Sequence, residues 1–482
     1  MKSMNRSGSA SMQKGGAVDV GIQERDNAKR ILLLEFNELS PILVDKFIAE
    51  GSLPNFERLR EMSVKFRTET SDEELQPWVQ WTTFHLGEPQ AKHGIFSLDE
   101  GHLIDGVPLW DDLSSRGYGS LVFGAMNGST SSAEVELLPD AWASRVEPTS
   151  ELFDRIHSFS SLAVQEHANP NAGPSKTRLA NDLLFLARNG LRAKTSLRLV
   201  SQVVLEKVLR RDTGWKRACL FDQLLWDVFL KQWTSSEKPV GVFFANSTAF
   251  LQHRFWRFMD SSDFRIKPTE RQDASYSDAI RHGYKSMDEM IGRVLDDPQL
   301  AETTIALATG LSQEANPSRM DSEPHEAYRP YDFAEILQWV GVTGVQSIEP
   351  LMTHLAWATF ESEAAAKAAA NQLRRATVES ASAFDFEVHG ERLKFWCSVL
   401  GLATEAPTLT NGLGVEVNFL EHFSLIGTSM QDGSHHPDGI FWVAQRSPGQ
   451  HEPSQEVISL PLEEAKGVLL DLVEADVPVG AR

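Results

Sequence analysis

The pattern of hydrophobic and polar residues divides the chain into alternating strands and helices. A continuous apolar run at 31–36, ILLLEF, predicts a strand that is buried on both faces of a parallel sheet. Helix start and stop signals follow it, with Ser40 at the N-cap, Pro41 at the first helical position and Gly51 at the end. A second apolar run at 240–245, VGVFFA, leads into a polar loop and a helical stretch. This order predicts an α/β fold.

Two segments depart from this pattern. Residues 150–235 carry Leu, Val and Phe at helical spacing with many Arg and Lys, which predicts a helical insertion. Its role is either a lid over the site or a solvated helical face. Residues 351–400 have the order strand, Ala-rich helix, strand and hairpin, which predicts a small α+β insertion. The expected organisation is a disordered tail at 1–28, core segments at 29–149, 236–350 and 401–482 (the last with a C-terminal helix), and the insertions at 150–235 and 351–400.

Composition and charge narrow the range of partners. The chain has 482 residues, 46 Lys and Arg against 67 Asp and Glu, and a net charge of -21, which argues against nucleic-acid binding. Cys219 and Cys397 are its two cysteines, so no disulfide framework is expected. The polar tail lacks a signal-peptide core, and no apolar run approaches the ~20 residues that span a bilayer. We therefore expect a cytoplasmic protein with no membrane partner and a small anionic ligand; the oligomeric state stays open.

Polar residues gather where the predicted strands end. Glu35, Asn37 and Glu38 lie at the end of the first strand, and Asn246, Thr248 and His253 follow the second. Open α/β sheets bind their ligands at the carboxyl ends of the strands. An acid inside an apolar strand, such as Glu35, is costly unless it is paired or bound. The alternative for Asn37 is a loop or cap residue, and for His253 a structural ring among its aromatic neighbours.

Several motifs in a fixed order resemble a known family. They are LPNFERLRE at 53–61, GEPQAKHGIF at 87–96, NSTAFLQHRFW at 246–256, YKSMDEMIGRVLDD at 284–297, TTIALATGLS at 303–312 and GSHHPDGIFWV at 433–443. Together they resemble the type I phosphodiesterase/nucleotide pyrophosphatase branch of the alkaline phosphatase superfamily. The resemblance implies an alkaline-phosphatase-like α/β sandwich around a mostly parallel sheet. It also implies a two-metal phosphoryl or sulfuryl hydrolase site at the strand ends.

Most of the metal-binding positions that the resemblance implies are altered. His253 and His435 remain, and both belong to one family metal site; His436 adjoins them. The usual Asp-Gly after the first strand reads Asn37-Glu38, and the position of the nucleophile falls on or near Pro77. The expected acids and the second-site histidine fall on Ala249, Thr309 and Gly310. Because two divalent ions need several carboxylates to offset their charge, we expect either one ion (Zn, Mn or Mg) or none.

Two classes of function stay open. One is a divergent hydrolase or transferase acting on a phosphate or sulfate ester, either with one metal on His253 and His435 or with no metal and acid or base work by Glu35, Glu38 and the His pair. Asn37 is a further candidate catalytic residue at the end of the first strand. Thr82 and Thr83 are the nearest hydroxyls to the missing nucleophile, although helix packing is the simpler role for them. Substrate contacts are expected from Trp78, Asn246 and Thr248. The other class is a non-catalytic relative that binds an anionic ligand or a partner protein.

Overall fold

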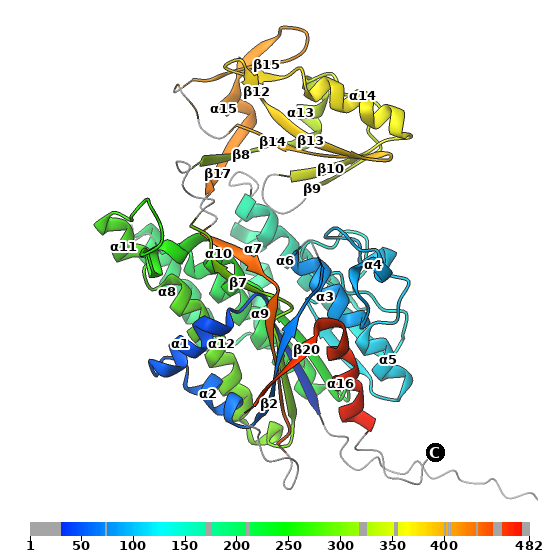
Figure 1. Ribbon diagram of the computed structural model, residues 1–482, viewed down its shortest axis with the longest axis vertical. Coiled ribbons are helices and arrows are strands. Elements are labelled where there is room, and N and C mark those ends of the chain that lie inside the picture. Colours follow the sequence, from blue (N-terminus) through cyan, green and yellow to red (C-terminus); the bar gives the residue numbers. More distant parts are fainter. Residues whose placement is uncertain are drawn as a thin grey trace, which may run out of the picture.

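The central element of the molecule is an eight-stranded, mostly parallel sheet (Figure 1). The computed structural model describes residues 30–72, 75–168, 176–208, 213–317, 325–350, 355–399, 402, 404, 406–429, 432–446 and 456–474, so the predicted tail lies outside it. The strand order is β20-β2-β19-β6-β1-β5-β3-β4. Strand β19 runs antiparallel to both of its neighbours, and the other pairs are parallel. This confirms the predicted α/β class.

The strands of this sheet are short, and those at its centre are buried. Their bounds are β1 Ile31–Phe36, β2 Ser63–Glu69, β3 Ser120–Phe123, β4 Val135–Leu138, β5 Val240–Ala245, β6 Thr304–Ala308, β19 Asp438–Ala444 and β20 Val457–Pro461. Strand β1 lies between β5 and β6, and all six of its residues are buried. Its continuous apolar sequence follows from this position, because both faces of the strand are covered.

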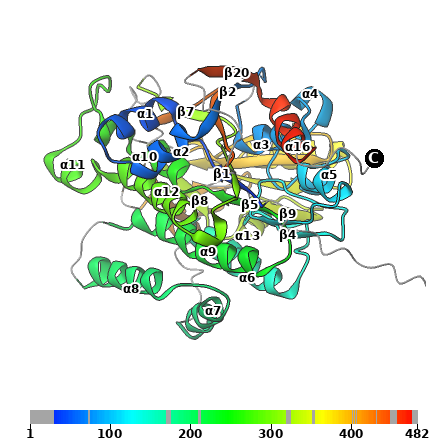
Figure 2. The ribbon, with the colours of Figure 1, turned by 90° about the horizontal axis from the view of Figure 1, so that it is seen from below.

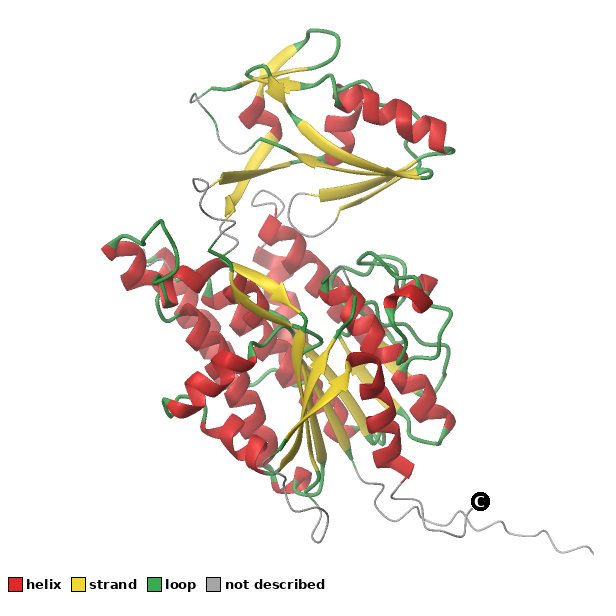
Figure 3. Cartoon of the chain, in the orientation of Figure 1, coloured by secondary structure: helices red, strands yellow, loops and turns green. Residues whose placement is uncertain are grey.

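Helices cover both faces of the sheet (Figures 2 and 3). One core includes Leu32, Leu34 and Phe36 of β1 and side chains of α1 (Pro41–Ala49), α2 (Pro54–Glu61), α9 (Lys216–Ser235), α10 (Ser247–Met259) and α12 (Ala279–Leu295). The opposite core includes Ile31 and Leu33 with side chains of α3 (Pro77–Leu86), α5 (Leu109–Ser115) and α16 (Ala465–Glu474). The alternation along β1 matches the period of two in a strand.

In the segment predicted as a helical insertion, the described residues form four helices. They are α6 (Glu151–Ala168), α7 (Lys176–Arg188), α8 (Ala193–Lys207) and α9. Helix α9 belongs to the core layer, because Trp226, Phe229 and Trp233 are fully buried against the sheet. In the part of the chain that the structure describes, no helix is long and apolar enough to cross a membrane.

A second unit with its own core lies between β7 (Ser312–Ala315) and β18 (Gly433–His436). It contains β8 (His325–Pro330), α13 (Phe333–Trp339), β9 (Ser347–Pro350), β10 (Leu355–Thr359), α14 (Glu363–Leu373), β13 (Phe384–His389), β14 (Arg392–Cys397) and β17 (Phe423–Ser429). Four of these strands form a sheet in the order β13-β14-β10-β9. The unit is wider than the 351–400 range that the sequence predicts, because Tyr328, Phe419 and Phe423 also belong to its core.

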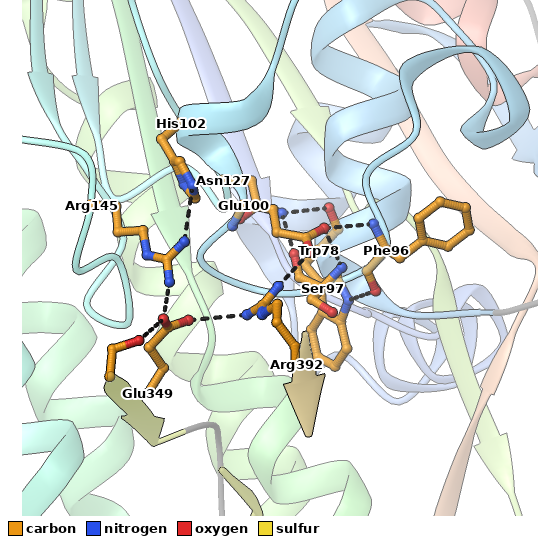
Figure 4. A network of polar contacts seen from close by, with 10 residues as sticks. Trp78, Phe96, Ser97, Glu100, His102, Asn127, Arg145, Glu349 and Arg392 are labelled. Carbon is orange, nitrogen blue, oxygen red and sulfur yellow. Dashed lines mark hydrogen bonds and ion pairs between the residues drawn. The ribbon is translucent and has the colours of Figure 1, made fainter. Parts of the chain in front are cut away.

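A polar network joins the second unit to the core of the molecule (Figure 4). Arg392 in β14 contacts Glu349 in β9 at 3.0 Å and Glu100 at 3.5 Å. Glu349 also pairs with Arg145. Glu100 accepts hydrogen bonds from the backbone N–H groups of Phe96 and Ser97, at 2.9 and 2.8 Å. The second unit is thus tied to the loop that carries Glu100.

The loop of Glu100 is supported by a buried acid. The N–H of Glu100 donates to the Asn127 side chain at 3.1 Å, and Asn127 holds a left-handed backbone with φ of 50°. Asp140 accepts the backbone N–H groups of Asn127 and Trp142, at 3.0 and 2.9 Å. Burial raises the pKa of Asp140 from its ordinary 3.8 to about 7.

We predict that acidification below neutral pH stabilises the protein through Asp140. The folded state binds this proton with a pKa of about 7 and the unfolded state near 3.8. The contribution of Asp140 is therefore fully present below pH 3.8 and is lost as the pH rises through 7. Its full size is on the order of 4 kcal/mol. Urea unfolding should show about 2.5–3 kcal/mol of this gain from pH 8 to pH 5 in wild type and lose it in Asp140→Asn; equal pH slopes would contradict it.

Candidate metal centre

Three side chains from separate parts of the sequence meet at the carboxyl ends of the central strands. Glu38 follows β1, His253 lies in α10 after β5, and His435 lies in β18, which pairs with β7. Nε2 of His253 lies 3.2 Å from Oε2 of Glu38, and Nε2 of His435 lies 3.4 Å from the same oxygen. One ligand atom from each residue lies within 4.8 Å of the others. We call Glu38, His253 and His435 the triad.

Backbone carbonyls fix the orientation of both imidazole rings. Nδ1 of His253 donates to the carbonyl of Gly433 at 3.0 Å, and Nδ1 of His435 donates to the carbonyl of Leu75 at 2.6 Å. In a neutral ring whose Nδ1 carries the hydrogen, Nε2 carries a lone pair and no hydrogen. Two lone pairs therefore face one carboxylate oxygen, which also carries only lone pairs. This arrangement needs a cation, either protons on the rings or a metal ion.

The spacing of the three donor atoms fits a metal. Bonds of about 2.0 to 2.2 Å in a tetrahedral arrangement place neighbouring ligand atoms about 3.3 Å apart. The observed separations from Glu38 are 3.2 and 3.4 Å. Metal-binding histidines commonly donate their other N–H to a carbonyl, as both rings do here. The triad therefore fits one divalent ion with two imidazole ligands and one carboxylate ligand.

The two imidazoles keep the carboxylate of Glu38 ionised when they carry the cation as protons. Burial raises the pKa of Glu38, but the charge of a protonated His435 and the hydrogen bonds that protonated His253 and His435 donate outweigh it. Together they hold the pKa of Glu38 well below its ordinary value. The side chain of Glu38 is 2% exposed, whereas those of His253 and His435 are 31% and 20% exposed. The triad is therefore closed on the carboxylate side and open to solvent on the imidazole side.

The backbone of Glu38 is held in an unusual conformation. Its φ is 61°, in the left-handed region that glycine adopts at no cost, and the resembled family usually has glycine at this position. The N–H of Glu38 donates to the carbonyl of Thr309 at 3.1 Å, and its carbonyl accepts from Gln252 at 2.7 Å. These bonds hold a strain of about 1–2 kcal/mol. Glu38 thus presents a carboxylate to His253 and His435, whereas Ala249 has no acid to present.

Two amides position the carboxylate of Glu38. Nδ2 of Asn37 donates to Oε1 of Glu38 and to Oδ1 of Asn246, both at 2.8 Å. Nε2 of Gln313 donates to Oε2 of Glu38 and, at 3.1 Å, to the carbonyl of Ala249. The sequence predicts Asn37 and Asn246 as site residues, and the structure places both beside the triad. The sequence analysis does not predict Gln313. The signal that could have found it is a polar residue shortly after the apolar run of β6.

A buried ion pair holds β18 against α10. Arg257 is 3% exposed and Asp432 is fully buried. Nε of Arg257 lies 2.9 Å from Oδ1 of Asp432, and the N–H of Asp432 donates to the carbonyl of His253 at 2.7 Å. The pair therefore fixes the strand of His435 relative to the helix of His253. Sequence reasoning missed both residues, because they are 175 positions apart.

An indole ring packs beside Gly310 and Asn37, two of the positions that the sequence resemblance relates to metal binding. Nε1 of Trp81 donates to Oδ1 of Asn37 at 2.8 Å. A Cβ added to Gly310, whose φ is 68°, would lie 3.0 Å from the Trp81 ring. The hydroxyl of Thr309 accepts the N–H of Ile440 at 2.9 Å, and Pro77 is the first residue of α3. These residues do not fit a second metal ion.

The structure places Glu35 away from the triad. Its Oε1 lies 2.7 Å from Nε2 of His85 in α3, and both side chains are buried. His85 belongs to α3, which packs on the opposite face of the sheet from α10. The buried acid is thus satisfied by pairing, the alternative that the sequence left open.

The predicted hydroxyl groups have structural partners. Thr82 donates to the carbonyl of Trp78 at 2.8 Å. Thr83 lies 3.1 Å from Nε2 of His93, whose Nδ1 accepts the N–H of Ile95 at 3.1 Å. In neutral His93 the hydrogen is therefore on Nε2, and the ring donates to Thr83 instead of accepting its proton. Neither threonine has an activating base, so the simpler helix-packing role describes them.

Three further predicted residues lie outside the triad. His436 pairs with Ser312 in the ribbon, and its Nδ1 accepts the N–H of Asp438 at 3.3 Å; it faces away from His435 because side chains alternate along a strand. Thr248 is buried beside Gly283 of α12. Trp78 donates from Nε1 to the carbonyl of Phe96 at 3.0 Å. The structure gives each of them a packing or hydrogen-bonding role.

Comparison with known proteins finds structural similarity only. No protein-family model and no curated protein matches the sequence. Similar solved structures include phosphonoacetate hydrolase from Sinorhizobium meliloti 1021 with phosphonoformate, at 10% identity, 92% coverage of this chain, 96% of that chain and a TM-score of 0.38. Murine and human ectonucleotide pyrophosphatase/phosphodiesterase 5 follow, each at 10% identity with 92% and 95% coverage, with TM-scores of 0.36 and 0.39.

The two ectonucleotide pyrophosphatase/phosphodiesterase structures carry the name of the branch that the ordered motifs resemble, and the phosphonoacetate hydrolase does not. At this identity and these TM-scores, what the enzymes act on does not transfer to this chain. The fold and the site define an α/β protein with a mostly parallel sheet and one three-residue candidate metal centre. The triad is the feature of this protein that points to a function.

We predict that Asp432→Asn destabilises the protein by about 3–5 kcal/mol, because it leaves the buried guanidinium of Arg257 without its counter-charge. The double variant Arg257→Met, Asp432→Leu should cost clearly less, since it removes both charges. Urea unfolding of the three proteins checks this. A single variant within about 1 kcal/mol of wild type would show that the pair does not hold β18.

Proposed function

We propose that this chain binds one divalent metal ion through Glu38, His253 and His435 and hydrolyses a small anionic ester, of the phosphate or sulfate class. The observation that carries the proposal is the convergence of two Nε2 lone pairs on one buried carboxylate, with both Nδ1 atoms committed to backbone carbonyls. When bound, such an ion supplies Lewis-acid polarisation of an ester oxygen and lowers the pKa of a bound water.

The protein supplies orientation and one open side. The carbonyls of Gly433 and Leu75 hold the rings, and the amides of Asn37 and Gln313 hold the carboxylate. The exposed side of the imidazoles is where an anionic substrate reaches the site. The ester class is supported by the motif resemblance.

The nucleophile in this proposal is a water molecule. Pro77 has no group that can attack phosphorus or sulfur, and the hydroxyls of Thr82 and Thr83 are engaged elsewhere. A covalent enzyme intermediate on these residues is therefore not part of the proposed reaction. This distinguishes the proposal from the reaction that the family resemblance implies.

A binding protein without catalysis is the second candidate. It is favoured by the Trp81 ring, which bonds to Asn37 and packs against Gly310, two positions that the motif resemblance relates to the metals of a hydrolase site. In that case the triad with its ion would bind an anionic ligand without turning it over. The two candidates share the metal and differ in turnover, so two measurements separate them.

The first measurement is the metal content. We predict one zinc ion per chain, with affinity reduced about 10- to 100-fold or more in Glu38→Gln, His253→Ala and His435→Ala, because each removes one of three ligands. His436→Ala is the matched control and should keep wild-type affinity. Elemental analysis with competition by a chromophoric chelator gives both numbers. Two tightly held ions per chain, or an effect of His436→Ala equal to that of His435→Ala, would contradict the assignment.

The second measurement is turnover of p-nitrophenyl phosphate, bis-p-nitrophenyl phosphate and p-nitrophenyl sulfate with added Zn, Mn or Mg. We predict EDTA-sensitive turnover of one substrate class, reduced about 10²-fold or more in Glu38→Gln and unchanged in Thr83→Val. Metal binding without turnover of any substrate, together with a thermal shift on adding phosphate or sulfate, would favour the binding protein. Loss of turnover in Thr83→Val would restore that threonine as nucleophile.

A further inference from the structure

Helix α8 has its polar and apolar sides reversed relative to an ordinary surface helix. Its buried residues are Thr195 and Gln202. Thr195 donates to Oδ2 of Asp227 in α9 at 2.5 Å, and Gln202 donates to the carbonyl of Thr213 at 2.7 Å. Arg198 bonds to Gln223 in α9 at 2.9 Å. The helix is therefore attached to the protein mainly through polar contacts.

The apolar side chains of α8 point to solvent. Leu197, Val200 and Val204 are 68%, 62% and 43% exposed, and Val208 at the C-cap is 70% exposed. Their spacing of three and four residues places them on one face of the helix. Val203 beside this stripe is also exposed. In Figure 2, α7 and α8 lie at the edge of the molecule, apart from the central sheet.

Cations flank this stripe in a chain that is otherwise acidic. Lys194 and Lys207 are exposed, and at 3.6 residues per turn they fall on opposite sides of Leu197 and Val204. Residues 176–217 contain eleven Lys and Arg against three Asp and Glu, a net charge of +8. The rest of the chain then carries -29. The positive charge is therefore concentrated in the stretch of sequence that contains α8.

We propose that α8 is a membrane-docking helix that lies in the surface of an anionic lipid bilayer. An amphipathic helix with aliphatic side chains on one face and Lys or Arg beside them binds such an interface with its apolar face buried. Anionic headgroups attract the flanking cations over a Debye length of about 8 Å, and they repel the rest of the acidic surface. Only an orientation that presents α8 is therefore attracted.

Charge favours lipid over a second copy of this chain. A symmetric contact of two α8 faces would bring Lys194 and Lys207 of both copies together, which costs energy through like-charge repulsion. The expectation of no membrane partner came from the lack of a bilayer-spanning run. A helix that lies in the interface needs no such run.

Vesicle co-sedimentation of the full chain tests the proposal. Vesicles of phosphatidylcholine mixed with phosphatidylserine should bind wild type at least tenfold more strongly than phosphatidylcholine alone, and high salt should weaken the binding. Leu197→Asp and Val204→Asp should each reduce binding at least tenfold. Both sites are exposed, so the fold should be kept, and circular dichroism checks this. Leu413→Asp, at an 85% exposed leucine of the second unit, is the matched control and should bind as wild type does.

Three results would overturn the proposal. They are no binding to anionic vesicles, equal binding by the Leu197→Asp and wild-type chains, and an equal loss in Leu413→Asp. Light scattering adds an independent reading: wild-type dimers that Val204→Asp dissociates, without vesicle binding, would make this face an interface between copies. Metal binding by the triad is not involved, so failure here leaves the proposed function untouched.

Discussion

The site depends on the convergence of three electron-pair donors at one point. Nε2 of His253 lies 3.2 Å and Nε2 of His435 lies 3.4 Å from Oε2 of Glu38. Each ring donates its Nδ1 hydrogen to a backbone carbonyl. Lone pairs that face one another repel unless a cation lies between them. The surrounding structure has to hold this arrangement, and much of it can be understood from that requirement.

Several contacts serve that purpose from outside the triad. The ladder of β5, β1 and β6 continues past the strand ends, through Asn37 to Ala245 and through Glu38 to Thr309, and fixes a left-handed residue where the carboxylate begins. The Arg257–Asp432 pair fixes β18 on α10. The same neighbourhood excludes a second ion, because Trp81 packs against Gly310 and bonds to Asn37.

The sequence predicts the elements that depend on local signals. The apolar run of β1 and the helix after Pro41 follow from periodicity and capping, and His253 and His435 follow from the ordered motifs. The role of Glu38 could not be predicted, because its direction depends on a positive φ that two neighbouring strands impose. The pairing of Glu35 could not be predicted for a similar reason. Its partner His85 lies 50 positions away, on a helix whose packing face is not visible in the sequence. The extent of the second unit could not be predicted either, because it depends on contacts of Phe423 with residues that are far away in the sequence.

X-ray absorption at the zinc edge of the zinc-loaded protein tests the central claim most directly. The account predicts two imidazole nitrogens at about 2.0–2.1 Å and oxygen ligands at about 2.0–2.2 Å, with no sulfur. In Glu38→Gln the nitrogen shell should keep two imidazoles if zinc still binds, and in His435→Ala it should keep one. A first shell without imidazole scattering, or one that is unchanged in His435→Ala, would contradict the assignment of the triad as the metal centre.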